Sequence, residues 1–496
     1  MNKFILFAVL LAVFVVPSSI SGTAIALPYI SNSIHSDLST LQWVVNAFNL
    51  TFACFTLVWG KISDVFGQKK SFVSGALIYT LASLGSALSH NTLMLDVFRG
   101  LAGIGGAAIF ACGSSIFIHV FDGQKRTKAF ALFGTTAGLG ITLGPTISGV
   151  LLDYMGWESI FYAHAMALFA VLIMSKKIPQ DDSHEGSMKQ IDSFGSILFI
   201  ISMFVWMLAL SKGYEWGWKS RPVFLCLIIG VVSFGAFITR AKLATYPVLN
   251  LGLLKNNKFL GLILVPVIAS FTFVTLLTYF PTYLTGSMRL SASNAGVIML
   301  FLTAPVLVCP LIAGKLSAQG VNTNLLMYLS ACCMIIGAGL LVYVIKYNMS
   351  LFGIAFALVL IGVGMGLSAG LVDGQALSCV SDKEVGMAAG LLNTFRLGSE
   401  AIAVALYGAL LSSTVSSIVP NVLQGNNSMS FDKWVSTVSS GDFAIVNQNS
   451  TLIEKLIDIY SEAFVKTNIT LVFIGMVFML LVVLLLSMDS RRKKSL

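Results

Sequence analysis

The sequence predicts an all-α polytopic membrane protein with about fourteen transmembrane helices. Of its 496 residues, 56% are hydrophobic and only 10% are charged, whereas a soluble domain carries roughly 25% charged residues. Apolar runs recur along the whole chain, and a helix of about 20 apolar residues is long enough to cross a bilayer. The 44 glycines against 11 prolines suit close packing between such helices.

The apolar runs place the individual spans. In chain order we expect them at about 5–28, 41–60, 71–89, 93–119, 129–152, 158–175, 193–211, 222–239, 259–284, 293–313, 324–346, 351–372, 387–412 and 467–488. The first run begins like a secretory signal peptide. Its apolar character continues from Ala24 to Leu27, so we expect a retained helix.

Basic residues set the expected orientation, because cytoplasmic loops carry an excess of Lys and Arg. With the N-terminus in the cytoplasm, the inside loops hold most of them: Lys61, Lys69, Lys70, Lys125, Arg126, Lys128, Lys176, Lys177, Lys189, Arg240, Lys242, Lys255 and Lys258. The basic C-terminal tail, 491–494, then also lies inside. Three basic residues fall in an outside loop: Lys212, Lys219 and Arg221. Either the protein tolerates these basic residues in an outside loop, or the predicted limits of spans seven and eight are wrong.

One long connection, about 413–466, should lie outside the cell. It is rich in Ser and Asn and ends in an amphipathic stretch at 452–460. Part of it either folds against the membrane face or forms a disordered spacer.

A short internal repeat predicts duplicated halves. Gly60-Lys61-Ile62-Ser63 follows the second span, Gly314-Lys315-Leu316-Ser317 follows the tenth, and each is followed shortly by another glycine, Gly67 or Gly320. Halves related by an axis along the membrane normal are typical of transporters. We therefore expect a six-helix bundle at 1–190, two inserted helices at 191–258 and a second six-helix bundle at 259–496.

The loop after the second span is the first candidate site. It contains Gly60, Lys61, Asp64, Gly67 and Lys69. A carboxylate at such a turn can accept hydrogen bonds from a facing helix N-terminus, which would latch a gate. A solvated basic loop is the simpler alternative.

Two further spans carry unusual residues. Arg99 in the fourth span needs a partner or a water-filled cavity, and Asp96 is one possible partner. The fifth span carries Gly134, Gly138, Gly140, Gly144, Pro145 and Gly149. The 134/138 and 140/144 spacings allow backbones to touch, and Pro145 should kink the helix.

Arg396 and Glu400 are the only charges in the apolar run 387–411. A charge in a span costs at least about 2.5–3.5 kcal/mol on insertion scales, so it is a functional candidate. The i,i+4 spacing puts both side chains on one helix face. They form either a working site or a pair that only neutralises itself.

These motifs together resemble the major facilitator superfamily. The 60–70 loop resembles its signature loop, Arg99-Gly100 its Arg-Gly motif, and 134–149 its antiporter motif. With about fourteen spans, the chain looks like the fourteen-span drug:proton antiporter family. The stretches 384–386 and 390–400 look like Gram-positive tetracycline efflux proteins.

The resemblance implies a major facilitator fold of two six-helix bundles with two inserted helices. It also implies a proton-coupled secondary-active exporter of small amphipathic compounds, including antibiotics. This family usually carries an acid in the first span, which is missing here between Ser18 and Thr23, and the tenth span has no acid either. Glu400 is then the expected proton carrier, Arg396 its tuner, and Arg99 a relay or a structural charge.

Other properties follow as expectations. We expect a monomer that is not an enzyme, driven by the proton gradient without a cofactor, metal or nucleic-acid partner, and acting on a small molecule. No Walker A motif occurs, so ATP is not expected to drive it. The location expected is a bacterial plasma (inner) membrane, with both termini cytoplasmic.

Two alternatives keep the spans but change the role. The scarcity of membrane acids, with Arg396 and Arg99 offered to an anion, fits a dedicated exporter of an endogenous metabolite, peptide or siderophore. A membrane sensor or scaffold is the other.

Overall fold

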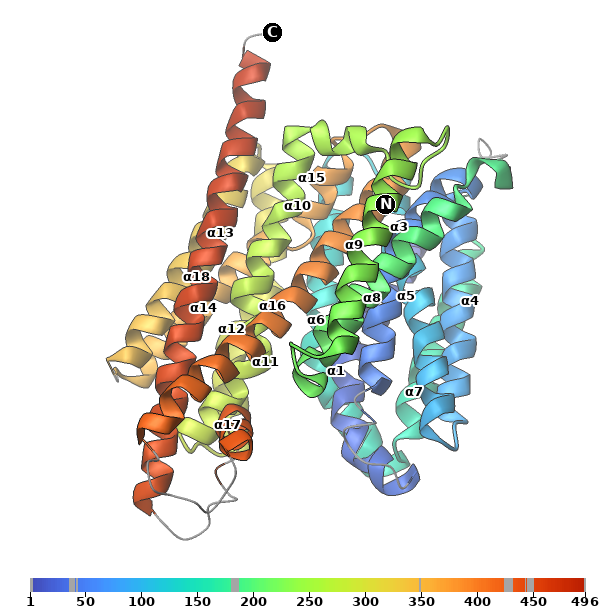
Figure 1. Cartoon of the computed structure of the whole chain (residues 1–496). Helices are drawn as coiled ribbons and strands as arrows, with labels where there is room; N and C mark the ends of the chain where they lie inside the picture. The colour runs from blue at the N-terminus through green and yellow to red at the C-terminus, as the bar shows by residue number, and fades with distance from the viewer. Residues whose placement is uncertain are drawn as a thin grey trace.

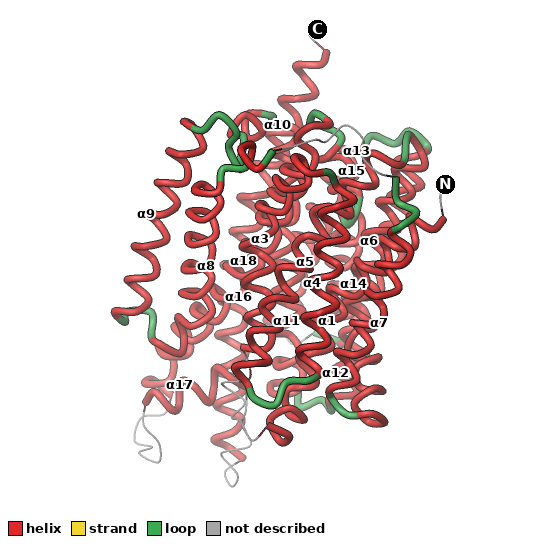
Figure 2. The backbone as a smooth tube through the Cα atoms, turned by 90° about the vertical axis from the view of Figure 1, so that its right-hand side faces the viewer, coloured by secondary structure: helices red, strands yellow, loops and turns green. Residues whose placement is uncertain are grey.

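A computed structural model describes residues 3–34, 41, 43–179, 187–347, 349–422, 431–441, 443 and 450–494. Within these residues the regular secondary structure is helical throughout (Figures 1 and 2). Thirteen of the described helical segments are long and apolar enough to cross a membrane. The remaining predicted span, at 71–89, is the more polar helix α4 (Gln68–Ala87), which packs against α5 (Thr92–Val120) and α7 (Glu158–Ser175).

The N-terminal half is a six-helix bundle. Besides α4, α5 and α7 it contains α1 (Lys3–Ile34), α3 (Trp43–Phe66) and α6 (Gly123–Met155). α1 packs against α6 and α7, and α5 packs against α3 and α4. The first apolar run is therefore an integral helix of the bundle, as expected.

The C-terminal half contains interrupted helices. Its first span runs through α10 (Asn257–Ala269), the π-helical turn η3 (Ser270–Val274), α11 (Thr275–Thr282) and a second π-helical turn, η4 (Tyr283–Ser287). α12 (Ala292–Ala318) and α13 (Thr323–Lys346) follow. The next span breaks into α14 (Leu351–Ser368) and α15 (Leu371–Leu377), and α16 (Val385–Val422) and α18 (Ser450–Lys494) complete the half.

The two inserted helices, α8 (Ser193–Trp216) and α9 (Arg221–Leu243), pack on each other. α8 also contacts α3 of one half and α16 of the other. Lys212, predicted in an outside loop, lies within α8, where it is buried and its Nζ is 5.4 Å from the Trp43 ring centroid. The helix pair is thus where we expected it, and the outside connection holds fewer basic residues than predicted.

The prediction of one long loop at 413–466 is wrong in its extent. Residues 413–422 continue α16, α17 spans Phe431–Ser440, and α18 begins at Ser450. The amphipathic stretch forms the first turns of α18, where Leu456, Ile459 and Tyr460 are buried. These helices extend further than hydropathy predicts because they pack on the aromatic core of their own half, where the Tyr283 and Phe464 rings are 4.4 Å apart. Residues 423–430, 442 and 444–449 of the predicted loop lie outside the described residues.

The halves contact each other mainly through α3 with α16 and α6 with α12. Figures 1 and 2 mark both chain ends in the upper part of the molecule, whereas α17 lies at the bottom. The upper end, where α3 gives way to α4, is called the Asp64 end below.

Candidate functional site

Asp64 joins the two halves. Its Oδ1 accepts a hydrogen bond from the backbone N–H of Gly386 at 2.6 Å, and its Oδ2 accepts one from Met387 at 2.7 Å. Both N–H groups belong to the first turn of α16, where amides have no partner within the helix and favour a negative charge. Asp64 of α3 therefore caps a helix of the opposite half.

The glycines beside Asp64 allow this approach. A Cβ atom on Gly60 would lie 2.8 Å from the carbonyl carbon of Gly386 and would also clash with its oxygen. Gly67 has a φ of 96°, which glycine adopts without strain, and it joins α3 to α4.

Lys69 contacts its own half. The Lys69 ammonium donates to the carbonyl of Ile178 at 2.5 Å, just beyond α7. Lys61 makes no hydrogen bond or ion pair with a residue that the structure describes. Of the predicted loop, Gly60 and Asp64 reach the other half.

The repeat occupies equivalent positions in the two halves. Gly314 in α12 faces α6, and a Cβ there would lie 2.6 Å from the Cβ of Ala131. Gly60 faces α16 in the same way, so both glycines lie at contacts between halves. Gly320 ends its repeat at a φ of 89°, as Gly67 does at 96°. This equivalence supports the predicted duplication.

The two glycine pairs of α6, 134/138 and 140/144, face two different neighbours. A Cβ on Gly134 would lie 2.6 Å from the carbonyl carbon of Ala369, and one on Gly138 would lie 3.0 Å from Val306 Cγ1. Both neighbours belong to the C-terminal half. The other register faces α1, because a Cβ on Gly140 would lie 2.6 Å from the carbonyl oxygen of Phe14.

The remaining motif residues differ from these. A Cβ on Gly144 would lie 2.9 Å from Ser18 Cα, again on α1. A Cβ on Gly149 would have no atom of a described neighbour within 4 Å, and Pro145 lies inside α6. α6 therefore packs through glycine on its own bundle and on the opposite half at once.

Arg99 is only 1% exposed and has no carboxylate partner among the described residues. Its Nη1 donates to Ser19 Oγ at 2.8 Å, its Nε donates to the carbonyl of Val44 at 2.9 Å, and it lies 4.5 Å from the Phe48 ring centroid. The suggested pairing with Asp96 does not form, because Arg99 points to α1 and α3. Ser19 thus contacts Arg99 from the stretch of α1 in which the family's acid is missing.

Arg396 pairs with Asp373 instead of Glu400. Its Nη2 lies 2.9 Å from Asp373 Oδ2, and its Nη1 donates to Asn393 Oδ1 at 2.9 Å. Glu400 is half-buried and makes no hydrogen bond or ion pair with any described residue. The idea of a self-neutralising Arg396–Glu400 pair is therefore wrong for this conformation.

Asp373 is the residue that sequence reasoning missed. Its side chain is 4% exposed, and it lies within the apolar helical segment Leu351–Leu377. Besides Glu400, Asp373 is therefore a second carboxylate within an apolar helical segment. The span was predicted to end at 372, because α14 breaks at Gly370 (φ 74°) before α15 continues. The signal available was a carboxylate one residue beyond an apolar run.

A second interrupted helix contacts α16 beside Glu400. Ser399 Oγ is 2.8 Å from Ser270 Oγ, which begins the π-helical turn η3, and it also donates to the carbonyl of Arg396. π-Helical turns are frequent at functional sites. Two interrupted helices therefore contact α16 next to its charged residues.

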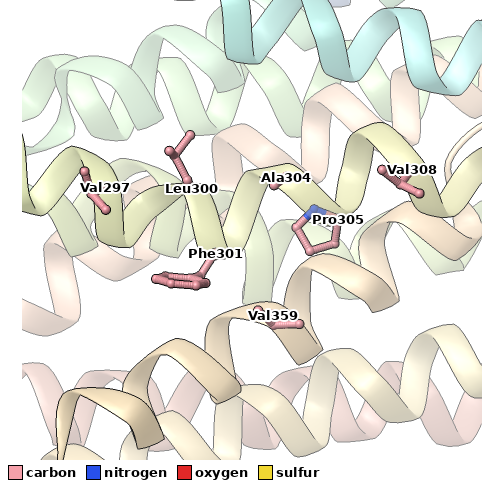
Figure 3. A pocket seen from close by; sticks show the side chains of 7 residues that line it. All are labelled: Val297, Leu300, Phe301, Ala304, Pro305, Val308 and Val359. Carbon is pink, nitrogen blue, oxygen red and sulfur yellow. The ribbon is translucent and has the colours of Figure 1, made fainter.

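An apolar groove of about 450 Å³ lies elsewhere on the C-terminal half (Figure 3). Its lining comes from one face of α12 and from α14: Val297, Leu300, Phe301, Ala304, Pro305, Val308 and Val359. It contains none of the predicted site residues and no group that recognises charge. Within the described residues no cluster of His, Cys, Asp and Glu fits a metal.

Comparisons with known proteins agree with this geometry. The model of the family described as "Major Facilitator Superfamily" matches residues 9–404. The chain is 28% identical to the uncharacterized MFS-type transporter YvkA of Bacillus subtilis, over 81% of this chain and 89% of that one. It is 27% identical to the multidrug transporter protein MdtP of the same organism, over 82% of this chain and 75% of that protein. It is also 27% identical to the tetracenomycin C resistance and export protein of Streptomyces glaucescens, over 84% and 77% of the two chains.

Two solved structures share the fold. The proton:xylose symporter XylE matches with a TM-score of 0.58 at 12% identity, covering 94% of both chains. The human organic anion transporter MFSD10 matches with a TM-score of 0.58 at 11% identity, covering 95% of this chain and 99% of that one. At these identities the likeness shows the fold alone.

Proposed function

Because this chain belongs to the Major Facilitator Superfamily, we propose that it is a proton-coupled exporter of small amphipathic compounds. It would act in a bacterial inner membrane, as a monomer without a cofactor, with both termini in the cytoplasm. Its similarity to a multidrug transporter, MdtP, and to the tetracenomycin C export protein supports export. The basic residues near the Asp64 end support its placement on the cytoplasmic side.

The position of Glu400 is the observation on which the proposal mainly rests. It is a half-buried carboxylate in a membrane-spanning helix, and Arg396 is already paired with Asp373. An unpaired charge in a bilayer is costly, so such a carboxylate favours a bound proton or a cation. This is the property required of a group that exchanges protons during transport.

The contacts between halves support alternating access. They include the Asp64 cap on α16 and the glycine contacts of α3, α6 and α12, and they close the Asp64 end. Release of these contacts would open the cytoplasmic side to substrate. Reformation would close that side and expose the site to the outside.

We expect Glu400→Gln to lose proton-driven export, because glutamine cannot load and unload a proton. The measurement is efflux from proteoliposomes with an imposed pH gradient, using ethidium and tetracycline as probes. Glu462→Gln is the matched control, since Glu462 is half-exposed and pairs locally with Lys466.

Two results would contradict the proposal. One is that neither probe is moved by the unaltered protein. The other is that efflux survives a protonophore or keeps its pH dependence in Glu400→Gln.

The alternative, an exporter of an endogenous metabolite, peptide or siderophore, rests on the scarcity of membrane acids and on Arg99 and Arg396 as cations offered to an anion. Arg99 is buried against Ser19 and Val44, and Arg396 is paired with Asp373. No observation favours this alternative over the first proposal.

A further inference from the structure

Two carboxylates in the C-terminal half are placed within reach of one guanidinium. Arg396 is paired with Asp373 of α15, and Glu400, four residues further along α16, makes no hydrogen bond or ion pair with a described residue. We propose that Arg396 exchanges between Asp373 and Glu400 during transport, so that Asp373 is a second proton-carrying group. This inference rests on the proposed proton coupling and adds a residue to it.

The Arg396 side chain can reach both carboxylates. Side chains at i and i+4 of a helix are neighbours, with Cβ atoms about 5–6 Å apart. An arginine side chain is long and flexible enough to contact Glu400 along the helix or Asp373 across to α15. Arg396 is 21% exposed, so it is not enclosed on all sides as Arg99 is.

The charges explain why a proton must accompany the exchange. Two carboxylates and one guanidinium leave one excess negative charge, which a membrane span disfavours. In the conformation seen, Arg396 neutralises Asp373, and the excess negative charge lies on Glu400. In the exchanged state a proton taken from water forms the O–H bond on Asp373, and Arg396 neutralises Glu400. The exchange therefore binds one proton, no other bond changes, and a falling pH favours it.

The position of Asp373 connects this exchange to the halves. Asp373 follows the break at Gly370, whose backbone packs against α6 of the N-terminal half: a Cβ on Gly370 would lie 3.1 Å from the Gly134 amide nitrogen. A Cβ on Gly374 would lie 3.0 Å from Phe130, also in α6. Loss of the Asp373–Arg396 pair frees α15 from α16 and therefore loosens this contact between halves.

Several charged groups on the packed elements have partners other than Asp373. The Lys258 ammonium of α10 lies 3.5 Å from the side-chain oxygen of Gln375. The other contacts of charged groups on these elements are Asp64 with α16, Arg99 with α1 and α3, Lys212 over Trp43, His119 with Ser115, and Arg126 with Asp122. Within the described residues Arg396 is the one cation paired with Asp373.

The test is hydrogen–deuterium exchange of the full-length protein in lipid nanodiscs, from about pH 5 to about pH 9, the range around the carboxyl and histidine values. The readout is deuterium uptake by peptides covering 366–380, with the labelling time at each pH scaled to the intrinsic exchange rate of an unprotected amide. In the unaltered protein we expect uptake to rise as pH falls, because protonation of Asp373 releases α15. In Asp373→Asn uptake should be high at every pH.

Glu400→Gln distinguishes exchange from a purely structural ion pair, and it keeps the test informative if Asp373→Asn misfolds. Without Glu400, Arg396 has no second partner, so uptake should stay low to a lower pH than in the unaltered protein. Asp382→Asn, an exposed acid just beyond α15, is the control and should match the unaltered protein. An unchanged pH profile in Glu400→Gln, or no pH dependence in the unaltered protein, would overturn the exchange. Proton-driven efflux is measured separately, so failure of the proposed function is distinguishable from failure of this inference.

Discussion

Asp64→Asn is expected to shift the protein away from the state that is closed at the Asp64 end and to reduce export severely. The Asp64 carboxylate accepts two hydrogen bonds from the first turn of α16. Hydrogen bonds to a charged group contribute about 1.5–3 kcal/mol each, and asparagine presents only one acceptor and no charge. A loss of about 2 kcal/mol changes the ratio of closed to open protein by up to roughly 30-fold.

Spin labels at exposed positions on either side of the contact would measure this shift. Lys70→Cys and Lys383→Cys, in a background without the seven native cysteines, report the distance between the halves. Asp122→Asn is the matched control, because its carboxylate is 95% exposed and pairs only with Arg126. Identical distance distributions for Asp64→Asn and the control would show that Asp64 does not hold this end closed.

Gly134→Ala should prevent normal closure between α6 and the C-terminal half. The added methyl would lie 2.6 Å from the carbonyl carbon of Ala369 and 2.8 Å from the amide nitrogen of Gly370. Both are backbone atoms, which cannot turn away as a side chain can, and overpacking of this kind costs about 1–3 kcal/mol. We expect a lower melting temperature and loss of probe efflux.

Gly149→Ala is the internal control, since no atom of a described neighbour lies within 4 Å of the position of its Cβ. It removes a glycine of the same helix and motif without creating a contact, and alanine favours the helix. We expect this variant to transport and melt like the unaltered protein. Equal activity of the two variants would show that the contact at Gly134 is not required for transport.

Hydropathy and repeats were sufficient to predict the spans and the two related halves. A bilayer imposes a length of about 20 apolar residues on every crossing helix, so composition reports the spans directly. The four-residue repeat was informative because Gly60 and Gly314 lie at equivalent contacts, where a side chain would clash.

Partnerships between helices were not predictable in the same way. Arg99 contacts Ser19, 80 positions earlier, and Arg396 pairs with Asp373 across a break in a helix. The apolar run ends near Gly370, so Asp373 was placed outside the membrane although its helix continues. Local spacing suggested Asp96 and Glu400 as partners instead, because i,i+3 and i,i+4 neighbours are the only contacts that a sequence displays.

The positions of the glycine contacts between the halves also determine how far the opposite end of the molecule moves when the halves tilt. If the halves tilt about the points where Gly60 meets Gly386 and Gly314 meets Ala131, these points act as a fulcrum. Trp43, at the far end of α3, lies roughly 25 Å from Gly60 at about 1.5 Å per residue. A tilt of about 10° would move it by roughly 4–5 Å, so a small rotation at the fulcrum becomes a wide movement at the opposite end of the lever arm.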